Sequence, residues 1–504
     1  MAISTQSPHA QAFFDQGLAL LHAFWFYEAD RSFAEAARLD PTCAMAQWGI
    51  AMANLNDARR EDALRRAREL RAAAPPREQL YIDAAAARDR GRRTAVQNNP
   101  SLGSTDAYRQ ALRRLVASFP DDVHARLFLA LASMDGYRSD GSPGPGTAEA
   151  VSLLRSVLTA QPEDPAAHHY LIHALEAGRP QDAVASADAY GTLVPGVGHA
   201  VHMPGHIYVH LDRWSDAAAA FERSAALDRS YMNDERETSD HTAGPYAHNL
   251  HFLATVYGYQ GRYHDGMRLA AEMMEVGSRP GETTSRAALE GRLAALRLMV
   301  RFEKWDDILA RGPDAGGLIV VEGWRHFAMG LANLAKGDLE MAHHELRALR
   351  KSVDETRDGL PNAAPQRALQ LRQSIALAVA PLELEGRIAA RERRADAAVT
   401  LLRRARDREA AIGYAEPPLY PHPMEEVLGR VLLDLHRWSE AEATFAAALS
   451  RDPGSGRALY GLAKAQEGAG HPDAARETYR RFRNAWATAD ADLPETAIVK
   501  RVSG

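Results

Sequence analysis

The sequence repeats itself, and this self-similarity limits the fold more than any other feature. Segments 213–228 (RWSDAAAAFERSAALD) and 437–453 (RWSEAEATFAAALSRDP) share an opening tryptophan, an acidic residue followed by alanine, and a later phenylalanine. Related segments occur at 30–41, 337–349 and 471–482. A small residue precedes several of these segments, at Gly17, Gly205, Gly330 and Gly429. Because small residues let antiparallel helices approach closely, the pattern predicts stacked helical hairpins.

The spacing of the last hairpins identifies the kind of repeat. The hairpins near 422–453 and 456–487 are offset by about 34 residues, the length of a tetratricopeptide repeat. We therefore predict an all-α fold, a tetratricopeptide-type helical hairpin solenoid with a concave groove. Three regions are expected within one continuous solenoid: N-terminal helical repeats at 1–135, central histidine-rich repeats at 148–275, and C-terminal helical repeats at 276–504.

Composition excludes several functional classes. The chain has 60 Lys+Arg against 66 Asp+Glu and no basic stripe with interleaved aromatics, so we expect no nucleic-acid partner. Its one cysteine, Cys43, excludes a multi-cysteine zinc site and is expected to be packed rather than reactive. No signal peptide and no apolar run of membrane-spanning length is apparent, which predicts a soluble, cytoplasmic protein without a membrane partner.

Histidines are concentrated in the central repeats. Ten of the 20 histidines lie between His168 and His251, one sixth of the chain, where an even spread would place about three. Their spacings of three and four residues put them on shared helix faces. When each repeat is counted from its turn, the first helices of three successive repeats point histidines into one groove: His169 and His173; His199, His202, His206 and His210; His248 and His251.

A metal ion would explain this concentration. Neighbouring imidazoles repel one another when protonated and waste apolar area when buried unpaired, whereas neutral imidazole is the commonest metal-binding side chain. A bound anionic ligand is the alternative. Pro204 lies where the first helix of its repeat should run, so either the entry turn of that helix is bent or Pro204 begins the helix.

The motifs AHHYLIHALE (167–176), LVPGVGHAVHMPGHIYVHLDRW (193–214) and YAHNLHFLA (246–254) resemble those of a bacterial family of tetratricopeptide-repeat proteins. The resemblance extends to FDQGLALLHAFWFYEADRSF near the start and to EPPLYPHP and FRNAWATADADL near the end. It implies that the motif histidines are His169, His173, His199, His202, His206, His248 and His251, with Glu176 closing the first motif. His168 and His210 depart from the family pattern, and the resemblance implies no particular reaction.

Three hypotheses for the function follow. The first is a metal-dependent enzyme, an oxidoreductase using copper or iron, with zinc as a further option, on a small organic substrate. The second is a non-catalytic tetratricopeptide scaffold that binds a peptide or an acidic ligand in the same groove. The third is a metal-free enzyme with histidine as general acid or base.

Additional residues are candidates around this site. A carboxylate for a two-histidine, one-carboxylate iron site could come from Glu176 or from the acidic segment 229–245, which is also a candidate lid or a solvated loop. His210, Tyr208 and Tyr246 are candidates for an additional ligand or a substrate contact, although packing is the better interpretation for Tyr208. The sequence has no HExxH, GxSxG or phosphate-binding glycine loop, which disfavours a zinc protease of the usual pattern and a nucleotide enzyme.

Overall fold

The computed structural model describes residues 1–54, 56–94, 106–138, 140–276, 285–313, 316–357, 359–360, 367–413, 415 and 417–497. Within these ranges the secondary structure is helical, and the β pairing is a single isolated bridge between Tyr137 and Pro143. The all-α prediction is confirmed. The chain divides into two compact units, Met1–Leu211 and Asp212–Gly504, and each is described by itself.

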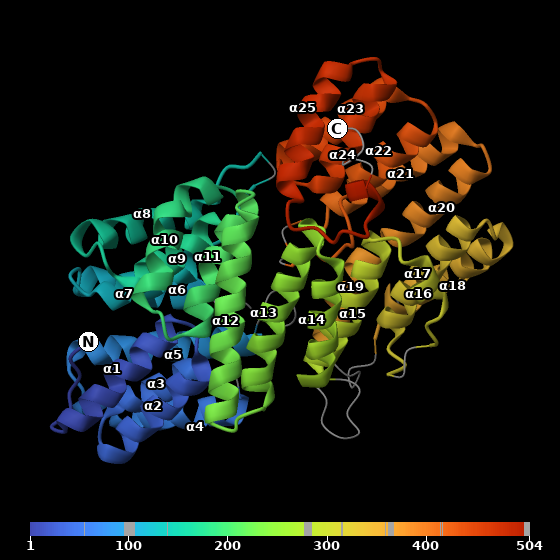
Figure 1. Ribbon diagram of the computed structural model, residues 1–504. Coiled ribbons are helices and arrows are strands. Elements are labelled where there is room, and N and C mark those ends of the chain that lie inside the picture. Colours follow the sequence, from blue (N-terminus) through green and yellow to red (C-terminus); the bar gives the residue numbers. More distant parts are fainter. Residues whose placement is uncertain are drawn as a thin grey trace. The chain divides into compact units, whose positions relative to one another are not determined.

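The first unit is built from consecutive antiparallel helices, coloured from blue to green in Figure 1. Neighbours along the chain pack on each other, as in α1 with α2, α7 with α8 and α10 with α11. The helices are α1 (Pro8–His22), α2 (Phe26–Leu39), α3 (Ala44–Ala53), α4 (Asp57–Leu70), α5 (Pro76–Thr94), α6 (Asp106–Ser118), α7 (Val123–Ser133), α8 (Pro145–Ala160), α9 (Pro165–Leu175), α10 (Val184–Leu193) and α11 (Gly198–His210), with short 3₁₀ turns at Arg71–Ala73 and Pro180–Ala183.

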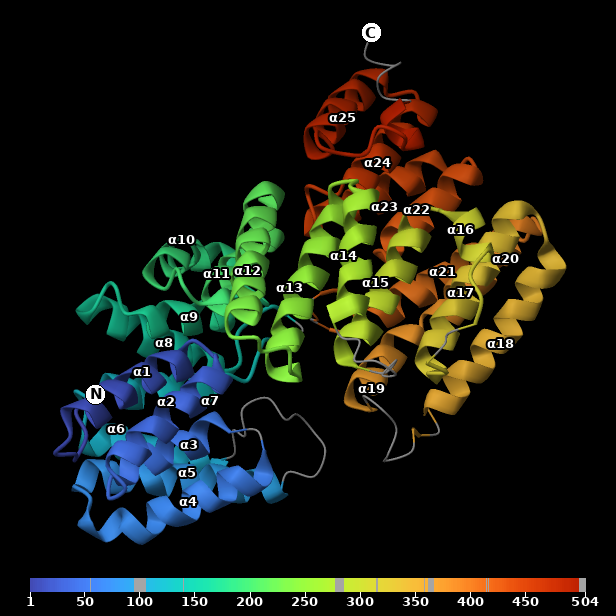
Figure 2. The ribbon, with the colours of Figure 1, turned by 60° about the horizontal axis from the view of Figure 1, so that its bottom comes forward.

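The second unit continues the same pattern. Figure 2 shows α13, α14 and α15 lying side by side, and their mutual packing agrees with this view. The helices are α12 (Trp214–Asp234), α13 (Asp240–Tyr259), α14 (Tyr263–Val276), α15 (Arg286–Arg301), α16 (Trp305–Leu309), α17 (Ile319–Lys336), α18 (Leu339–Arg357), α19 (Arg367–Leu377), α20 (Ala380–Arg391), α21 (Ala395–Ala410), α22 (Met424–Asp434), α23 (Trp438–Arg451), α24 (Gly456–Gly468) and α25 (Pro472–Ala485).

Small residues allow the hairpins to close, as the repeats predict. The rings of Phe33 and Phe445 occupy the space in which a side chain would stand on Gly17 and Gly429. A Cβ atom on Gly429 would lie 2.6 Å from Cζ of Phe445. The helices α12 and α23 begin at the two repeat tryptophans, Trp214 and Trp438. The predicted repeat hairpins are therefore real packing units.

Distant parts of the second unit are in contact. The Trp486 indole N–H donates to the carbonyl oxygen of Tyr259 at 2.8 Å, and the Asp490 amide donates to the Gly261 carbonyl at 3.0 Å. The Trp486 ring also packs against Phe302. The two hydrogen bonds join the end of α13 and the turn after it to residues 486–490, which follow α25. The division between the units accordingly falls inside the predicted central region 148–275, after Leu211.

The acidic segment 229–245 differs from its prediction as a lid or solvated loop. α12 continues to Asp234 and α13 begins at Asp240, so only residues 235–239 lie outside helices. The Thr242 hydroxyl donates to the Glu237 carbonyl at 2.9 Å and so secures the turn between them. The segment therefore forms the ends of two helices that pack against each other. No helix in the described ranges is both long and apolar enough to cross a bilayer.

Candidate metal centre

The helix α11 carries the predicted ladder of histidines on one face. His199, His202, His206 and His210 follow one another at spacings of three, four and four residues, which aligns them along the helix. α11 begins at Gly198 and runs without interruption through Pro204. The interpretation in which Pro204 starts the helix is therefore wrong. Residues 198–203, for which a bent entry turn was the other prediction, are part of the helix.

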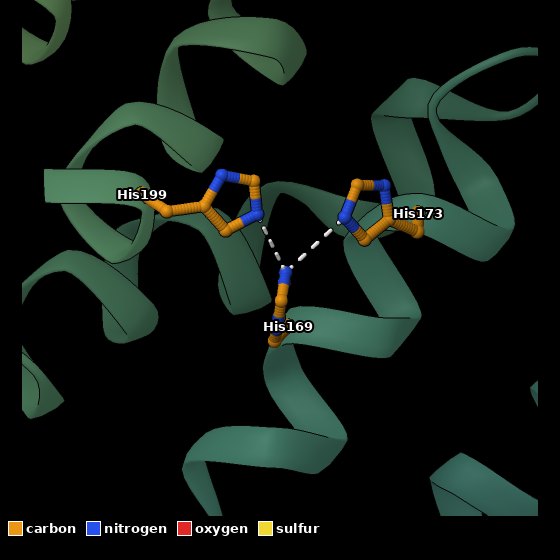
Figure 3. A group of neighbouring side chains, drawn as sticks. All are labelled: His169, His173 and His199. Atoms are coloured by element: carbon orange, nitrogen blue, oxygen red, sulfur yellow. Dashed lines mark hydrogen bonds between the residues drawn. The ribbon is translucent and has the colours of Figure 1, made fainter. Parts of the chain in front are cut away.

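Three imidazoles of the first unit converge (Figure 3). His169 and His173 project from α9, and His199 projects from α11. Nε2 of His169 lies 3.1 Å from Nε2 of His199 and 3.1 Å from Nε2 of His173. One ring nitrogen of each histidine lies within 4.8 Å of the other two. The cluster therefore presents three nitrogen atoms to one small volume, and we call it the trihistidine cluster.

The protonation state of His169 fits a metal ligand. Its Nδ1 lies 2.7 Å from the backbone oxygen of His22, and a carbonyl oxygen can only accept a hydrogen bond. Nδ1 therefore carries the hydrogen, and Nε2 keeps its lone pair directed at the cluster. Burial lowers the pKa of His169 well below its ordinary value, and the neighbouring His173 and His199 lower it further. His169 is thus held in the neutral form that binds metals.

The carboxylate of Glu176 lies beside two imidazoles, those of His173 and His206. Glu176 follows the last residue of α9, and its Oε1 lies 3.3 Å from Nδ1 of His173. Its Oε2 lies 3.4 Å from Nδ1 of His206. A carboxylate beside Nδ1 favours a hydrogen on that atom and leaves Nε2 as the donor toward a metal, the common carboxylate–histidine–metal arrangement. Nε2 of His206 lies 2.7 Å from Nε2 of His202, which gives a second imidazole pair along α11.

The short contacts between Nε2 atoms limit what can lie between them. Two lone pairs facing each other at 3.1 Å repel, so either a hydrogen atom carried by one of the two nitrogens or a metal ion must lie between them. Two nitrogens bound to one tetrahedral metal ion at 2.0–2.1 Å are about 3.3 Å apart, close to the separations in the trihistidine cluster. The donor set, the two separations of 3.1 Å and the fixed tautomer of His169 fit a transition-metal ion.

Phe24 covers the trihistidine cluster on one side. Its ring centroid lies 4.5 Å from that of His169, 5.5 Å from His173 and 5.6 Å from His199. Its backbone φ is +57°, a left-handed conformation that is uncommon for a residue with a side chain. Phe24 also lines a pocket with about 400 Å³ of empty space, counted to its open mouth, bounded mainly by apolar and aromatic side chains with Arg88.

Sequence reasoning did not assign a role to His22 or to Phe24. His22 is the last residue of α1, and Phe24 lies in the turn after it, almost 150 residues before His169. The available signal was the aromatic run HAFWFY, which begins at the last residue of α1 and is too hydrophobic for an ordinary exposed turn.

The remaining candidates of the first unit have other partners. The Tyr208 hydroxyl donates to Oδ1 of Asp188 at 2.6 Å, and His210 ends α11. His168, next to the cluster in sequence, has Nδ1 3.0 Å from the Ser186 hydroxyl and Nε2 2.9 Å from the Pro162 carbonyl. The His168 ring therefore contacts other residues and does not belong to the trihistidine cluster.

The other candidates belong to the second unit. His248 and His251 lie on α13, and the ring of His248 meets the Phe252 ring edge-on. Nε2 of His251 lies 3.3 Å from Nη1 of Arg297, and its Nδ1 lies 3.8 Å from a carboxylate oxygen of Glu290. Both ring nitrogens of His251 thus face charged groups of its own unit.

Tyr246 belongs to a chain of polar side chains in the same unit. Its hydroxyl accepts a hydrogen bond from Nε of Arg229 at 2.7 Å and donates one to Glu272. The structure therefore brings together His169, His173 and His199, and pairs His202 with His206, while Tyr246 contributes to packing between helices.

Comparison with known proteins identifies the type of repeat in one part of the chain. Residues 427–490 match the model of the family described as tetratricopeptide repeat. No curated protein matches the sequence. Similar solved structures include yeast Tom70 (12% identity, TM-score 0.34, covering 98% of this chain and 95% of Tom70) and a tetratricopeptide repeat protein from Parabacteroides merdae (12% identity, TM-score 0.34, covering 71% and 98%). Residues 427–490 are thus tetratricopeptide repeats, within a chain whose described secondary structure is helical.

Proposed function

We propose that this chain is a tetratricopeptide-type binding scaffold whose first unit holds a transition-metal ion in the trihistidine cluster. One observation carries the proposal: the Nε2 atoms of His169, His173 and His199 converge, and the His22 carbonyl fixes the tautomer of His169. A scaffold of this kind offers its helical surface to a peptide or another ligand. The metal ion would lock α9, α11 and the turn after α1 into one arrangement.

The donor set favours particular metals. A site with three imidazoles and no thiolate favours copper or zinc, because imidazole is a common ligand of both metals. Glu176 faces the Nδ1 side of His173 and His206, which suits an orienting role more than direct ligation. An iron site with two histidines and one carboxylate is therefore the weaker expectation. When bound, a copper or zinc ion would supply Lewis acidity, and copper would also supply one-electron chemistry.

Elemental analysis of untagged protein tests the proposal. We expect near-stoichiometric copper, zinc or iron after reconstitution and desalting, and loss of that metal from the His169→Ala, His173→Ala double variant. His168→Gln is the matched control, since His168 lies on the same helix, α9, and its ring has partners outside the cluster, Ser186 and the Pro162 carbonyl. The control should retain the metal. Protein without metal after reconstitution, or equal metal in the double variant, would exclude the trihistidine cluster as the site.

A metal-dependent oxidoreductase acting on a small organic substrate is the second candidate. The pocket of about 400 Å³ favours it, because Phe24 lines this pocket and also contacts all three rings of the cluster. An apolar substrate in that pocket would be separated from the three histidine rings by the Phe24 side chain. In this case the ion needs an exchangeable coordination position, which azide can report through a change in the visible spectrum of the copper- or cobalt-loaded protein. A spectrum indifferent to azide would favour the scaffold without catalysis.

A further inference from the structure

A second pocket lies entirely within the second unit, between α13, α15 and the connection after α21. It holds about 440 Å³ of empty space, counted to its open mouth. Two arginines of α15 line it, Arg297 and Arg301. They are four residues apart and therefore lie on one face of the helix. Both are buried, with exposed fractions of 8% and 7%.

Arg297 has partners without a negative charge. Its Nη2 donates to the amide oxygen of Gln373, and its Nη1 lies 3.3 Å from Nε2 of His251. Its Nε is buried and has no hydrogen-bond partner among the described residues. Burial lowers the pKa of Arg297 to about 10, partly offset by Glu290. The Arg297 guanidinium is therefore removed from water without a carboxylate that accepts its hydrogen bonds. Burying a charge in this way costs free energy, and a bound anion would offset that cost.

Arg301 is positioned beside it. Its Nε donates to the Gly258 carbonyl at 3.3 Å, and the guanidinium lies 4.5 Å from the centroid of the Tyr259 ring. The nearest carboxylate oxygen, on Glu426, is 3.6 Å from Nη1, longer than a good charged hydrogen bond. Arg301 is therefore held in place but still able to bind an oxygen atom entering the pocket.

The rest of the pocket wall is largely apolar. Ala254, Ala294, Leu298, Pro418 and Pro421 line it, together with the ring of Tyr259. The apolar wall offers no hydrogen bonds to the additional oxygen atoms of a dianion. The two guanidinium groups can each bind one oxygen atom of a single carboxylate. The pocket therefore favours a ligand that has one negative charge and an apolar part.

We propose that this pocket binds a small organic carboxylate, with its carboxylate on Arg297 and Arg301 and its apolar part against Leu298, Pro418 and Pro421. The site is separate from the trihistidine cluster in residues and in unit. Its ligand can therefore be tested whether or not the cluster holds a metal.

The test uses the full chain and two probe acids, benzoate and hexanoate, with benzamide as the neutral match for benzoate. We expect at least one acid to raise the melting temperature saturably, as preferential binding to the folded state requires, and benzamide to have no such effect. Arg297→Met should abolish the shift. Arg350→Gln should retain it, since Arg350 pairs with Glu385 at the surface of the same unit.

A conservative variant and a direct binding measurement distinguish loss of the ligand site from misfolding of the Arg297→Met variant. Arg297→Lys keeps a charge but loses the planar pair of donors, so we expect roughly tenfold weaker binding. Fluorine NMR of 4-fluorobenzoate with the parent protein measures binding without any substitution. The proposal is overturned if neither acid binds, if benzamide binds as well as benzoate, or if Arg297→Met binds normally. A shift from inorganic phosphate equal to that from the acids would also overturn the assignment to a carboxylate.

Discussion

Replacing Glu383 should strongly destabilise the second unit. Glu383 lies on α20 with no exposed surface, and its carboxylate meets Nη2 of Arg387 at 2.8 Å, Nε2 of His422 at 3.0 Å and the Tyr420 hydroxyl at 2.8 Å. Tyr420 and His422 belong to the connection that walls the carboxylate pocket. Glu383→Gln keeps the shape and a hydrogen-bond acceptor but removes the charge, so it isolates the electrostatic part of this anchor.

The magnitude follows from the pKa of Glu383. Burial alone would raise that pKa, but the charges of His422 and Arg387 and the hydrogen bonds from His422 and Tyr420 outweigh it and lower the pKa from 4.5 to about 2. A shift of this size corresponds to about 3 kcal/mol of folding free energy. Removing one partner of a buried ion pair typically costs about 3–5 kcal/mol, which agrees. We expect Glu383→Gln to cost about 3 kcal/mol at pH 7.

The dependence on pH has a definite sign. Because the pKa of Glu383 is lower in the folded chain, its contribution is complete above pH 4.5 and disappears as the pH falls toward 2. The difference between parent and variant should therefore shrink to about 1.4 kcal/mol at pH 3. Glu385→Gln is the matched control, because Glu385 lies on the same helix in a surface pair with Arg350 and should cost less than about 1 kcal/mol.

Hydrogen exchange measured by mass spectrometry on peptides of α20 to α22 reports the local opening free energy at both pH values. A cost below about 1 kcal/mol at pH 7, or a cost equal at pH 7 and pH 3, would refute the reasoning.

The remaining predictions concern the cluster, the hairpins and the cysteine. Glu176→Gln should weaken metal binding by roughly 10- to 100-fold in a zinc competition titration, because it loosens the orientation of two imidazoles; unchanged affinity would exclude that role. Gly429→Ala should lower the unfolding free energy by about 1–3 kcal/mol in a urea titration, because its methyl group would meet the Phe445 ring, whereas Gly312→Ala has nothing within 4 Å and should be neutral. Burial raises the pKa of the Cys43 thiol to about 11, so Ellman's reagent should react with it only after unfolding, and rapid reaction of native protein would contradict this.

Local sequence patterns predicted the hairpins well. The repeat tryptophans mark the first residues of α12 and α23, and the glycine at 429 lies against the ring of Phe445 as hairpin packing requires. Such contacts form between residues within about one repeat of each other, so they can be predicted from the spacing of residues along the chain.

The candidate site was only partly visible in the sequence. Helical spacing placed His169 and His173 on one face, but it could not reveal the His22 carbonyl or the Phe24 ring, which reach the site from the end of α1 and the turn after it. The carboxylate pocket was missed although a signal existed. Arg297 and Arg301 stand four residues apart in an otherwise apolar stretch of helix, where two cationic side chains on one face are unusual.

The contacts of Trp486 with Tyr259 and of Asp490 with Gly261 change how the second unit should fold. An ordinary array of repeats loses stability step by step when repeats are removed from one end, because each repeat contacts only its neighbours. Here the final hairpin supports the hairpin of α13 and α14, more than 200 residues earlier. The loop that closes between them raises the contact order, so folding should be slower and more nearly all-or-none than in an open array. A chain shortened before α24 would lose support at α13 itself, and with it a wall of the carboxylate pocket.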